Sequence, residues 1–293
     1  MSGIVAKETF THGTKDFNFA AYPHSYFDAY PLGFDAHWHD EWEIIYVRDG
    51  VFRFYADGKL YEVRKNQALL IDPYAIHVSA DYEIGNGSGY NCFVFGRQFL
   101  CPDSESYIYR RYFQQLDSNS ISLTQCITGR NTYEKQIVKH LDALDNLSQN
   151  PDQNALPIQI ALLSVFSILL KEQAYFNLTH QTSGQNELVK KALLSIKQNY
   201  LDSLTIQSLA ELLNVNTDYF IRIFKKTVGV TPKQYIQNLR IQKAVSLMQY
   251  EPETSVSDIA QRTGFHDANY FSRSFKKMTG VTPTQYIQQF SQE

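Results

Sequence analysis

An internal repeat near the C-terminal end constrains the fold more than any other feature of this chain. The stretch FKKTVGVTPKQYIQ at 224–237 returns as FKKMTGVTPTQYIQ at 275–288, an offset of 51 residues. Upstream, SLAELL at 208–213 corresponds to DIAQRT at 258–263, an offset of 50 residues. Because the offset changes by one residue between these segments, we expect two copies of one supersecondary unit that differ in the length of a turn.

Each copy is predicted to form two helices joined by a tight turn. Thr205 and Asn216 stand where they can cap the two helices of the first copy. Ser255 and Asp267 occupy the corresponding places in the second copy. In each copy a Thr-Pro pair then precedes a third helix, with proline at its first position. These signals together predict two helix-turn-helix units.

The second helix of each unit is predicted to have an apolar face and a polar face. At about 100° per residue, Phe220, Ile223 and Phe224 fall together on one side of the first such helix. Phe271 and Phe275 fall together in the same way in the second. The opposite sides carry Asp, Asn, Ser, Arg and Lys, so these sides should remain free for a partner.

The polar faces carry the groups that bind DNA. Arginine can form two hydrogen bonds with guanine, asparagine can do so with adenine, and lysine neutralises phosphate. An isolated lysine pair is usually only a solvated surface charge, but here the pair recurs at the same helix position in both copies. Residues 184–293 hold 13 Lys/Arg and 9 Asp/Glu, whereas residues 1–183 hold 14 and 21. The basic charge therefore lies in the part predicted to enter the major groove.

The segment 187–290 resembles the DNA-binding domain of the AraC/XylS family of transcription regulators, most specifically in GFHDANYFSRSFKKMTGVTPTQY. The resemblance implies two helix-turn-helix subdomains joined by a long helix, here at about 232–248. By position, the residues expected to read bases are Asp218, Ile221, Arg222, Asn269, Ser272 and Arg273. Those expected to bind phosphate are Asn216, Lys225, Lys226, Lys276 and Lys277. Ile221 departs from the small polar residues usual at its position, and it could contact a thymine methyl group.

The first part of the chain shows the pattern of a β-structure. Between 17 and 99, short aromatic and β-branched runs alternate with turn signals, and Asp49-Gly50 and Asp57-Gly58 each predict a hairpin. This pattern predicts an antiparallel barrel or sandwich. Two helices are predicted within 132–150 and 156–176, where apolar residues recur at helical spacing.

The predicted fold class is α+β with two domains, the first a cupin-like antiparallel β-barrel followed by helices, the second all-α with two helix-turn-helix subdomains. The expected boundaries are a barrel at 1–130, a helical dimerisation segment at 131–176, a polar linker at 177–186 and the DNA-binding domain at 187–293. Because 156–176 is apolar almost all round, the helices at 132–176 are predicted to form a symmetric homodimer interface.

The stretch HWHDEWE at 37–43 places His37, His39 and Glu43 on one face of a predicted strand, with His77 downstream. The longer run HWHDEWEIIYVRDG fits the first cupin motif, and barrels of this kind are common in the family resembled here. The second motif is only partly present, because Ala75 stands where glycine is usual. Three interpretations remain open, namely a divalent metal site, hydrogen bonding to a small ligand, and histidines that only satisfy one another.

Each interpretation assigns its own residues. A bound Zn, Mn, Fe or Ni would use His37, His39, Glu43 and His77, and no other cofactor is expected. A small-molecule effector would use His37, His39, Glu43, Arg53, Tyr74 and His77. Family members with this architecture often govern carbohydrate use, so the resemblance implies a sugar as the effector.

We therefore expect an effector-controlled transcription regulator, an activator rather than an enzyme, whose partners are double-stranded DNA, a second copy and RNA polymerase. A metal-dependent cupin enzyme fused to a DNA-binding domain is the main alternative, and a regulator with a ligand-blind structural barrel is another. The three cysteines form no CxxC pair, which favours a reducing cytoplasm. The longest apolar run, 158–170, is too short to span a membrane.

Overall fold

The computed structural model describes residues 12–14, 16–22, 34–83, 89–118, 120–177, 180–202, 204–251 and 253–290. The chain divides into two compact units, one formed by Lys7–Glu187 and the other containing Leu188–Glu293. Each unit has a hydrophobic core of its own. None of the described helices is both long and apolar enough to cross a membrane.

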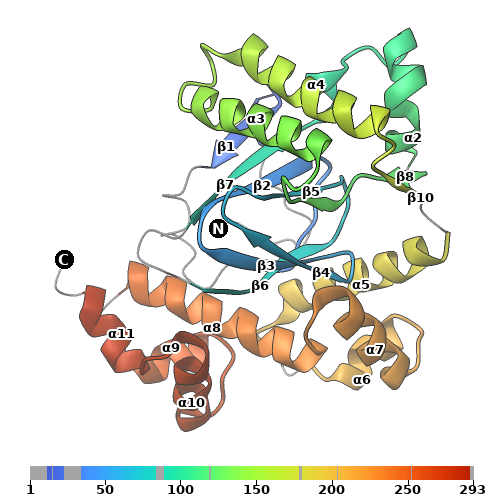
Figure 1. The fold of residues 1–293 in the computed structure, drawn as a ribbon. Helices are drawn as coiled ribbons and strands as arrows, with labels where there is room; N and C mark the ends of the chain where they lie inside the picture. The colour runs from blue at the N-terminus through green and yellow to red at the C-terminus, as the bar shows by residue number, and fades with distance from the viewer. Residues whose placement is uncertain are drawn as a thin grey trace. The chain divides into compact units, whose positions relative to one another are not determined.

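The N-terminal unit is built on antiparallel sheets, as predicted (Figure 1). A five-stranded sheet has the order β1-β7-β2-β5-β9, a three-stranded sheet the order β4-β3-β6, and β10 pairs with β8. The strands are β1 (Phe19–Tyr22), β2 (Trp42–Asp49), β3 (Val51–Ala56), β4 (Lys59–Arg64), β5 (Ala68–Ile71), β6 (His77–Glu83), β7 (Gly89–Phe95), β8 (Ile121–Ser122), β9 (Gln125–Ile127) and β10 (Phe176–Asn177).

Strand β2 is central because both of its faces are buried. Ile44 and Tyr46 belong to the core shared with the helices. Ile45 and Val47 belong to a second core, formed with residues of the three-stranded sheet. Glu43 lies two residues before Ile45, so its side chain is on the same side as this second core.

Two helices cover the five-stranded sheet, α3 (Thr132–Leu147) and α4 (Ala155–Lys171), and the sequence predicted both (Figure 1). The shorter helical segments of this unit are α1 (Arg97–Leu100), the π-helical η2 (Tyr109–Phe113) and α2 (Gln114–Asp117). Phe166 of α4 packs edge-on against Trp42 of β2, with ring centroids 5.1 Å apart. The second helix ends at Lys171, five residues before the predicted end.

One of the two predicted hairpins is wrong. Asp57-Gly58 does join a paired hairpin, in which Ala56 of β3 lies opposite Lys59 of β4, and both turn residues have positive φ. At Asp49-Gly50, however, the chain passes from one sheet to the other. Strand β2 already has β5 and β7 as its two neighbours, so β3 has no free edge of β2 to pair with.

The polar linker predicted at 177–186 is not irregular throughout, because α5 (His180–Asn199) begins inside it. Later turns of α5 bury Val189, Ala192 and Leu193. A helix anchored by such residues can extend backwards through polar residues such as glutamine at little cost, which the lack of apolar periodicity did not reveal. The division between the two compact units falls between Glu187 and Leu188.

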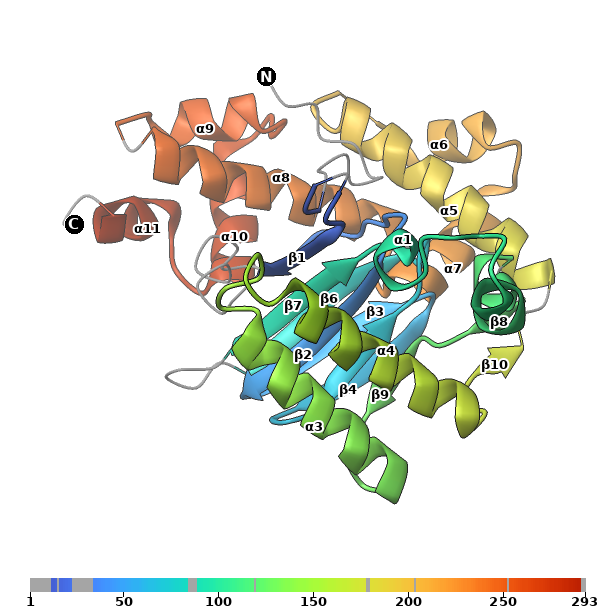
Figure 2. The same ribbon diagram turned by 90° about the horizontal axis from the view of Figure 1, so that it is seen from above.

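The second unit has the predicted repeat of helices. After α5 come α6 (Ile206–Leu212), α7 (Thr217–Val228), α8 (Pro232–Tyr250), α9 (Val256–Arg262), α10 (Ala268–Thr279) and α11 (Pro283–Phe290). Helix α8 contacts α7, α9, α10 and α11. The two helix-turn-helix units, α6–α7 and α9–α10, lie toward opposite ends of α8 (Figure 2).

Each of the four predicted N-caps accepts a backbone hydrogen bond. The pairs are Thr205 with the N–H of Ser208, Asn216 with those of Asp218 and Tyr219, Ser255 with that of Asp258, and Asp267 with that of Tyr270. The start of α8 carries a full capping box between Thr231 and Gln234. Local sequence signals thus determine where these helices begin.

The turn between the two helices of each unit contains a left-handed residue, Asn214 (φ 54°) in the first and Gly264 (φ 86°) in the second. At Gly264 an added Cβ would lie 2.9 Å from Nε of Arg240 and 3.2 Å from the carbonyl oxygen of Tyr200. Arg240 donates to the carbonyls of Tyr200 and Asp202, at 2.8 and 2.9 Å, and so connects α8 to the segment after α5. Only glycine fits this turn without displacing Arg240.

Gly264→Ala is therefore predicted to destabilise the second helix-turn-helix unit by at least about 1–2 kcal/mol, the cost of left-handed backbone for a residue with a Cβ. Native-state hydrogen exchange in α9 and α10 measures this loss. Asn214→Gly is the matched control at the equivalent turn, and it should change stability by no more than about 0.5 kcal/mol. Unchanged exchange in Gly264→Ala would contradict the tight packing of Arg240 against this turn.

Candidate functional site

Helix α7 has a polar face and, on the opposite side, a fully buried apolar face. Phe220 and Phe224 are completely buried. On the other side Asp218 and Arg222 are exposed, whereas Ile221 is half-buried. Lys225 and Lys226 are exposed in the last turn, and Asn216 is exposed while its side chain caps the helix. Of the residues predicted to read bases or bind phosphate in this helix, all but Ile221 are thus exposed.

Helix α10 repeats the arrangement. Phe271 and Phe275 are completely buried, and Asn269, Arg273, Lys276 and Lys277 are exposed. Ser272 is half-buried, and its hydroxyl donates to the carbonyl of Ala268 at 2.9 Å. Ser272 must therefore rotate, or accept through its oxygen, in order to contact a base.

The two arginines at equivalent positions are held differently. The guanidinium of Arg222 lies over the ring of Tyr219, 5.5 Å from its centroid. Within the described part of the chain, Arg273 makes no such contact and no ion pair. Arg273 is thus free to take the orientation that a base requires.

Helix α10 is fixed in place by a polar contact as well as by its phenylalanines. Ser274, buried on the inner face of α10, accepts a hydrogen bond of 2.7 Å from the side-chain amide of Gln237 on α8. Helical spacing places Ser274 on the same face as Phe271 and Phe275. Its small side chain at that position was the sole signal of a close approach between the two helices.

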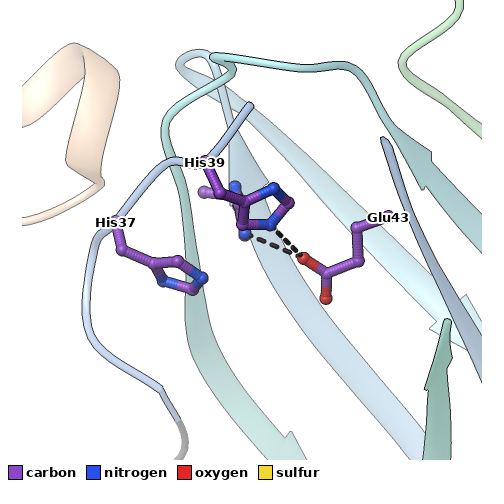
Figure 3. Close-up of side chains that lie close together, drawn as sticks. His37, His39 and Glu43 are labelled. Atoms are coloured by element: carbon purple, nitrogen blue, oxygen red, sulfur yellow. Dashed lines mark hydrogen bonds and ion pairs between the residues drawn. The ribbon is translucent and has the colours of Figure 1, made fainter. Parts of the chain in front are cut away.

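In the N-terminal unit, His37, His39, Glu43 and His77 come together as one cluster. Figure 3 shows the first three of these side chains. One potential ligand atom from each residue lies within 4.8 Å of those from the other three. Nε2 of His39 and Nε2 of His77 lie 3.1 and 3.0 Å from Oε2 of Glu43. Only His37 is half-exposed, whereas the other three are buried.

The backbone segments that position these four residues differ from those expected. His37 and Trp38 do not belong to β2, which begins only at Trp42. Instead, His37 forms an isolated backbone bridge with His77, and each N–H donates to the carbonyl of the other at 3.1 and 3.0 Å. His39 stands in the irregular segment between that bridge and β2. Side-chain alternation along one strand therefore does not account for the convergence.

The three histidine rings share one hydrogen-bonding pattern. Nδ1 of His37, His39 and His77 lies 2.7, 3.1 and 2.9 Å from the backbone carbonyl oxygens of Asp35, Glu41 and Ala75, respectively. A carbonyl oxygen can only accept, so in each contact Nδ1 must be the donor. This pattern directs Nε2 of each ring away from the backbone that anchors Nδ1.

Glu43 is held as a carboxylate. Burial alone would raise the pKa of Glu43, but the charge of His77 and hydrogen bonds from His39 and His77 outweigh burial and hold this pKa well below its usual range. Sγ of Cys92 on β7 donates to Oε1 of Glu43 at 2.8 Å. Cys92 could not be placed at the site from the sequence, because a cysteine outside any motif carries no positional signal.

The structure does not bring the other two predicted effector residues into the cluster. Arg53 lies on the face of β3 opposite the buried Phe52 and Phe54, and its guanidinium pairs with Glu62 at 2.8 Å. Tyr74 is exposed with a positive φ of 64°, although its N–H donates to the carbonyl of His39 at 2.7 Å. Strand register, which turn signals alone did not fix, decides the face of Arg53.

Aromatic rings border the cluster on one side. Phe34 packs edge-on against His37 and His77, with ring centroids 5.3 and 5.8 Å apart. Phe34 is also stacked on Phe54, at 5.7 Å, and Phe54 meets Tyr90 edge-on. The arrangement combines apolar walls with a few fixed polar groups, which is typical of a small-molecule site.

Known proteins match both units. Residues 26–99 match the family described as AraC-like ligand binding domain, and residues 209–289 match the family described as helix-turn-helix domain. The chain is 24% identical to the uncharacterised HTH-type transcriptional regulator YdeC of Bacillus subtilis, over 85% of this chain and 84% of that protein. It is 27% identical to the HTH-type transcriptional activator RhaS of Escherichia coli, over 85% and 86%.

A further relative is the lactose operon transcription activator of Staphylococcus xylosus, 26% identical over 62% of this chain and 65% of that protein. The two family matches thus fall on the sheet unit and on the pair of helix-turn-helix units. The chain belongs to the AraC family of DNA-binding transcription regulators and carries an AraC-like ligand-binding domain.

Proposed function

We propose that this regulator is a transcription activator that reads DNA bases through α7 and α10 and responds to a small carbohydrate bound beside the histidine cluster. The single observation that carries the proposal is the repeated amphipathic helix. In both copies a completely buried pair of phenylalanines holds exposed arginine and lysine side chains on the opposite face. Such a rigid helix can enter a major groove without first having to order its backbone.

The residues proposed to read bases remain Asp218, Ile221, Arg222, Asn269, Ser272 and Arg273. Of these, Arg273 is the strongest candidate, because it is exposed and makes no competing contact among the described residues. Arg222 would exchange its position over Tyr219 for a guanine edge. The exposed lysines at the ends of both helices are proposed to bind phosphate.

The effector site is supported by the polar cluster and its aromatic border. Carbohydrates bind to sites that combine hydrogen-bonding side chains with aromatic faces, and Phe34 with the three histidines supplies both. The lactose operon activator among the relatives supports a sugar rather than another small molecule. The relatives named as regulators over most of this chain favour this function over the alternative of a cupin enzyme.

Strand β2 offers a physical connection between the effector site and α3. Glu43 faces the cluster, whereas the hydroxyl of Tyr46 on the opposite face donates to Asp142 of α3 at 2.7 Å. Arg48, farther along β2, donates to Asp142 at 3.0 Å and lies 3.3 Å from Asp145. An effector that binds one arrangement of β2 and α3 more tightly than another would shift the population toward it.

A homodimer through α3 and α4 is part of the proposal, with RNA polymerase as a further partner of the activator. Leu156 and Ile160 of α4 are large apolar side chains that are 65% and 55% exposed. They follow one another on one side of the helix, and burial against a second copy would remove them from water.

Arg273→Ala is predicted to weaken binding to the preferred DNA sequence by about 1–3 kcal/mol and to relax the preference at one base position. Lys277→Ala should instead weaken binding to all sequences and lower the slope of log affinity against log salt by about one. Binding titrations on cognate and random duplexes at several salt concentrations separate the two effects. Arg64→Ala, an exposed arginine of β4, is the control; equal losses on both duplexes for Arg273→Ala would contradict base reading.

A thermal-shift screen of the full chain against mono- and disaccharides should find a sugar that stabilises the protein and changes its affinity for DNA. His77→Gln is predicted to abolish that response, and His140→Gln on α3 should retain it. If the bound sugar leaves DNA affinity, dimerisation and transcription all unchanged, control by an effector is refuted. Stabilisation only by compounds of another class would refute the carbohydrate alone.

Ile160→Glu is predicted to shift the chain from dimer to monomer, because it introduces a charge into the proposed apolar interface. Sedimentation velocity over a range of protein concentrations measures the change. Gln114→Glu, at an exposed position of α2, controls for added charge. A dimer equally stable in Ile160→Glu would exclude this face of α4 as the interface.

A further inference from the structure

We propose that His37, His39, Glu43 and His77 bind one divalent transition-metal ion within the ligand-binding domain. This site would be independent of DNA recognition, since all four residues belong to the N-terminal unit. Three imidazole nitrogens and one carboxylate oxygen would be the donor atoms.

The positions of the donor atoms suit a single ion. Metal bonds to histidine nitrogen and carboxylate oxygen are about 2.0–2.2 Å long, so the ligands of one ion lie roughly 3–4.5 Å from one another. The four potential donors are already within 4.8 Å of each other. Small side-chain rotations, without movement of a strand, would complete the coordination.

The histidine tautomers are set for metal binding. Each Nδ1 faces a backbone carbonyl oxygen, so a neutral ring carries its proton there and presents a lone pair at Nε2. A second hydrogen bond of this kind, from the ring nitrogen that is not a ligand, is found in nearly all metal-binding histidines. It fixes the ring orientation and raises the basicity of the ligand nitrogen. Here all three histidines make this hydrogen bond through Nδ1.

The electrostatics of the cluster also call for a cation. Glu43 is only 5% exposed, so little water reaches its negative charge. Without a metal ion, that charge is balanced by N–H groups at Nε2 of His39 and His77, which lie 3.1 and 3.0 Å from Oε2. A divalent ion bound by the same three groups would replace these protons and supply the positive charge in their place.

The donor set selects the class of ion. Imidazole ligands favour Zn²⁺, Fe²⁺, Ni²⁺ or Co²⁺, whereas Mg²⁺ and Ca²⁺ prefer sites made only of oxygen. Cys92 is proposed to act through Glu43 and not as a ligand, because its Sγ is hydrogen-bonded to Oε1 while Oε2 faces the histidines. An ion that accepts five or six ligands would retain a position for an oxygen atom of an effector.

The test measures metal binding by the full chain, purified without a histidine tag and stripped with a chelator. Equilibrium dialysis against Zn²⁺ or Co²⁺, followed by elemental analysis, should give one ion per chain. His39→Gln and Glu43→Gln should each weaken binding at least about tenfold. His140→Gln, which removes a histidine outside the cluster, should bind as the native chain does.

Controls separate loss of the site from loss of the fold. Circular dichroism of the metal-free variants checks that they are folded, and His37→Gln, at the half-exposed position, replaces any variant that is not. Less than stoichiometric metal in the native chain, or equal binding by the cluster variants, would overturn the proposal. The Co²⁺ complex should lack a thiolate charge-transfer band; a band that Cys92→Ser removes would refute the donor set.

The same samples distinguish this proposal from the proposed function. DNA affinity is measured with and without Zn²⁺. A chain that binds its DNA sequence but no metal overturns only the metal site. A chain that binds metal but shows no sequence preference supports the metal site and contradicts the proposed function.

Discussion

Burial of β2 on both faces is the constraint on which the N-terminal unit depends. One face packs on α3 and α4 through Trp42, Ile44 and Tyr46, and the other lines the core shared with the three-stranded sheet. Because the strand is fixed from both sides, Glu43 cannot turn away from the histidines. The same strand therefore holds the carboxylate of the proposed ligand site and contacts the helices proposed to form the dimer.

In the C-terminal unit, both helix-turn-helix units use the same packing to hold one helix face exposed. Each short helix-turn-helix unit buries its phenylalanines against its own helices and α8, and this burial leaves one face of α7 and of α10 for a partner. Two contacts hold the second helix-turn-helix unit, α9–α10, against α8. They are the packing of Arg240 at the Gly264 turn and the hydrogen bond from Gln237 to Ser274. The orientation of the base-reading face thus follows from core packing, and not from the exposed residues themselves.

Local signals in the sequence predicted much of this structure. Caps, the Thr-Pro pairs and the repeat gave the helices of the second unit, and HWHDEWE with His77 gave the members of the cluster. Strand pairing was less accessible, because it depends on partners far along the chain. Asp49-Gly50 therefore appeared to be a hairpin, and Arg53 was assigned to a face that the register of β3 turns outward. The contact between Cys92 and Glu43 could not be predicted either, because it depends on the pairing of β7 with β2.

The proposed function requires α7 and α10 of one chain to read bases in successive major grooves. Selection of binding sites from random duplex DNA, followed by hydroxyl-radical footprinting of the enriched sequence, measures this. We expect an asymmetric site for each chain, protected on one face of the duplex over about two helical turns, roughly 20 base pairs. No enrichment of any sequence, or protection of only a single groove per chain, would contradict it.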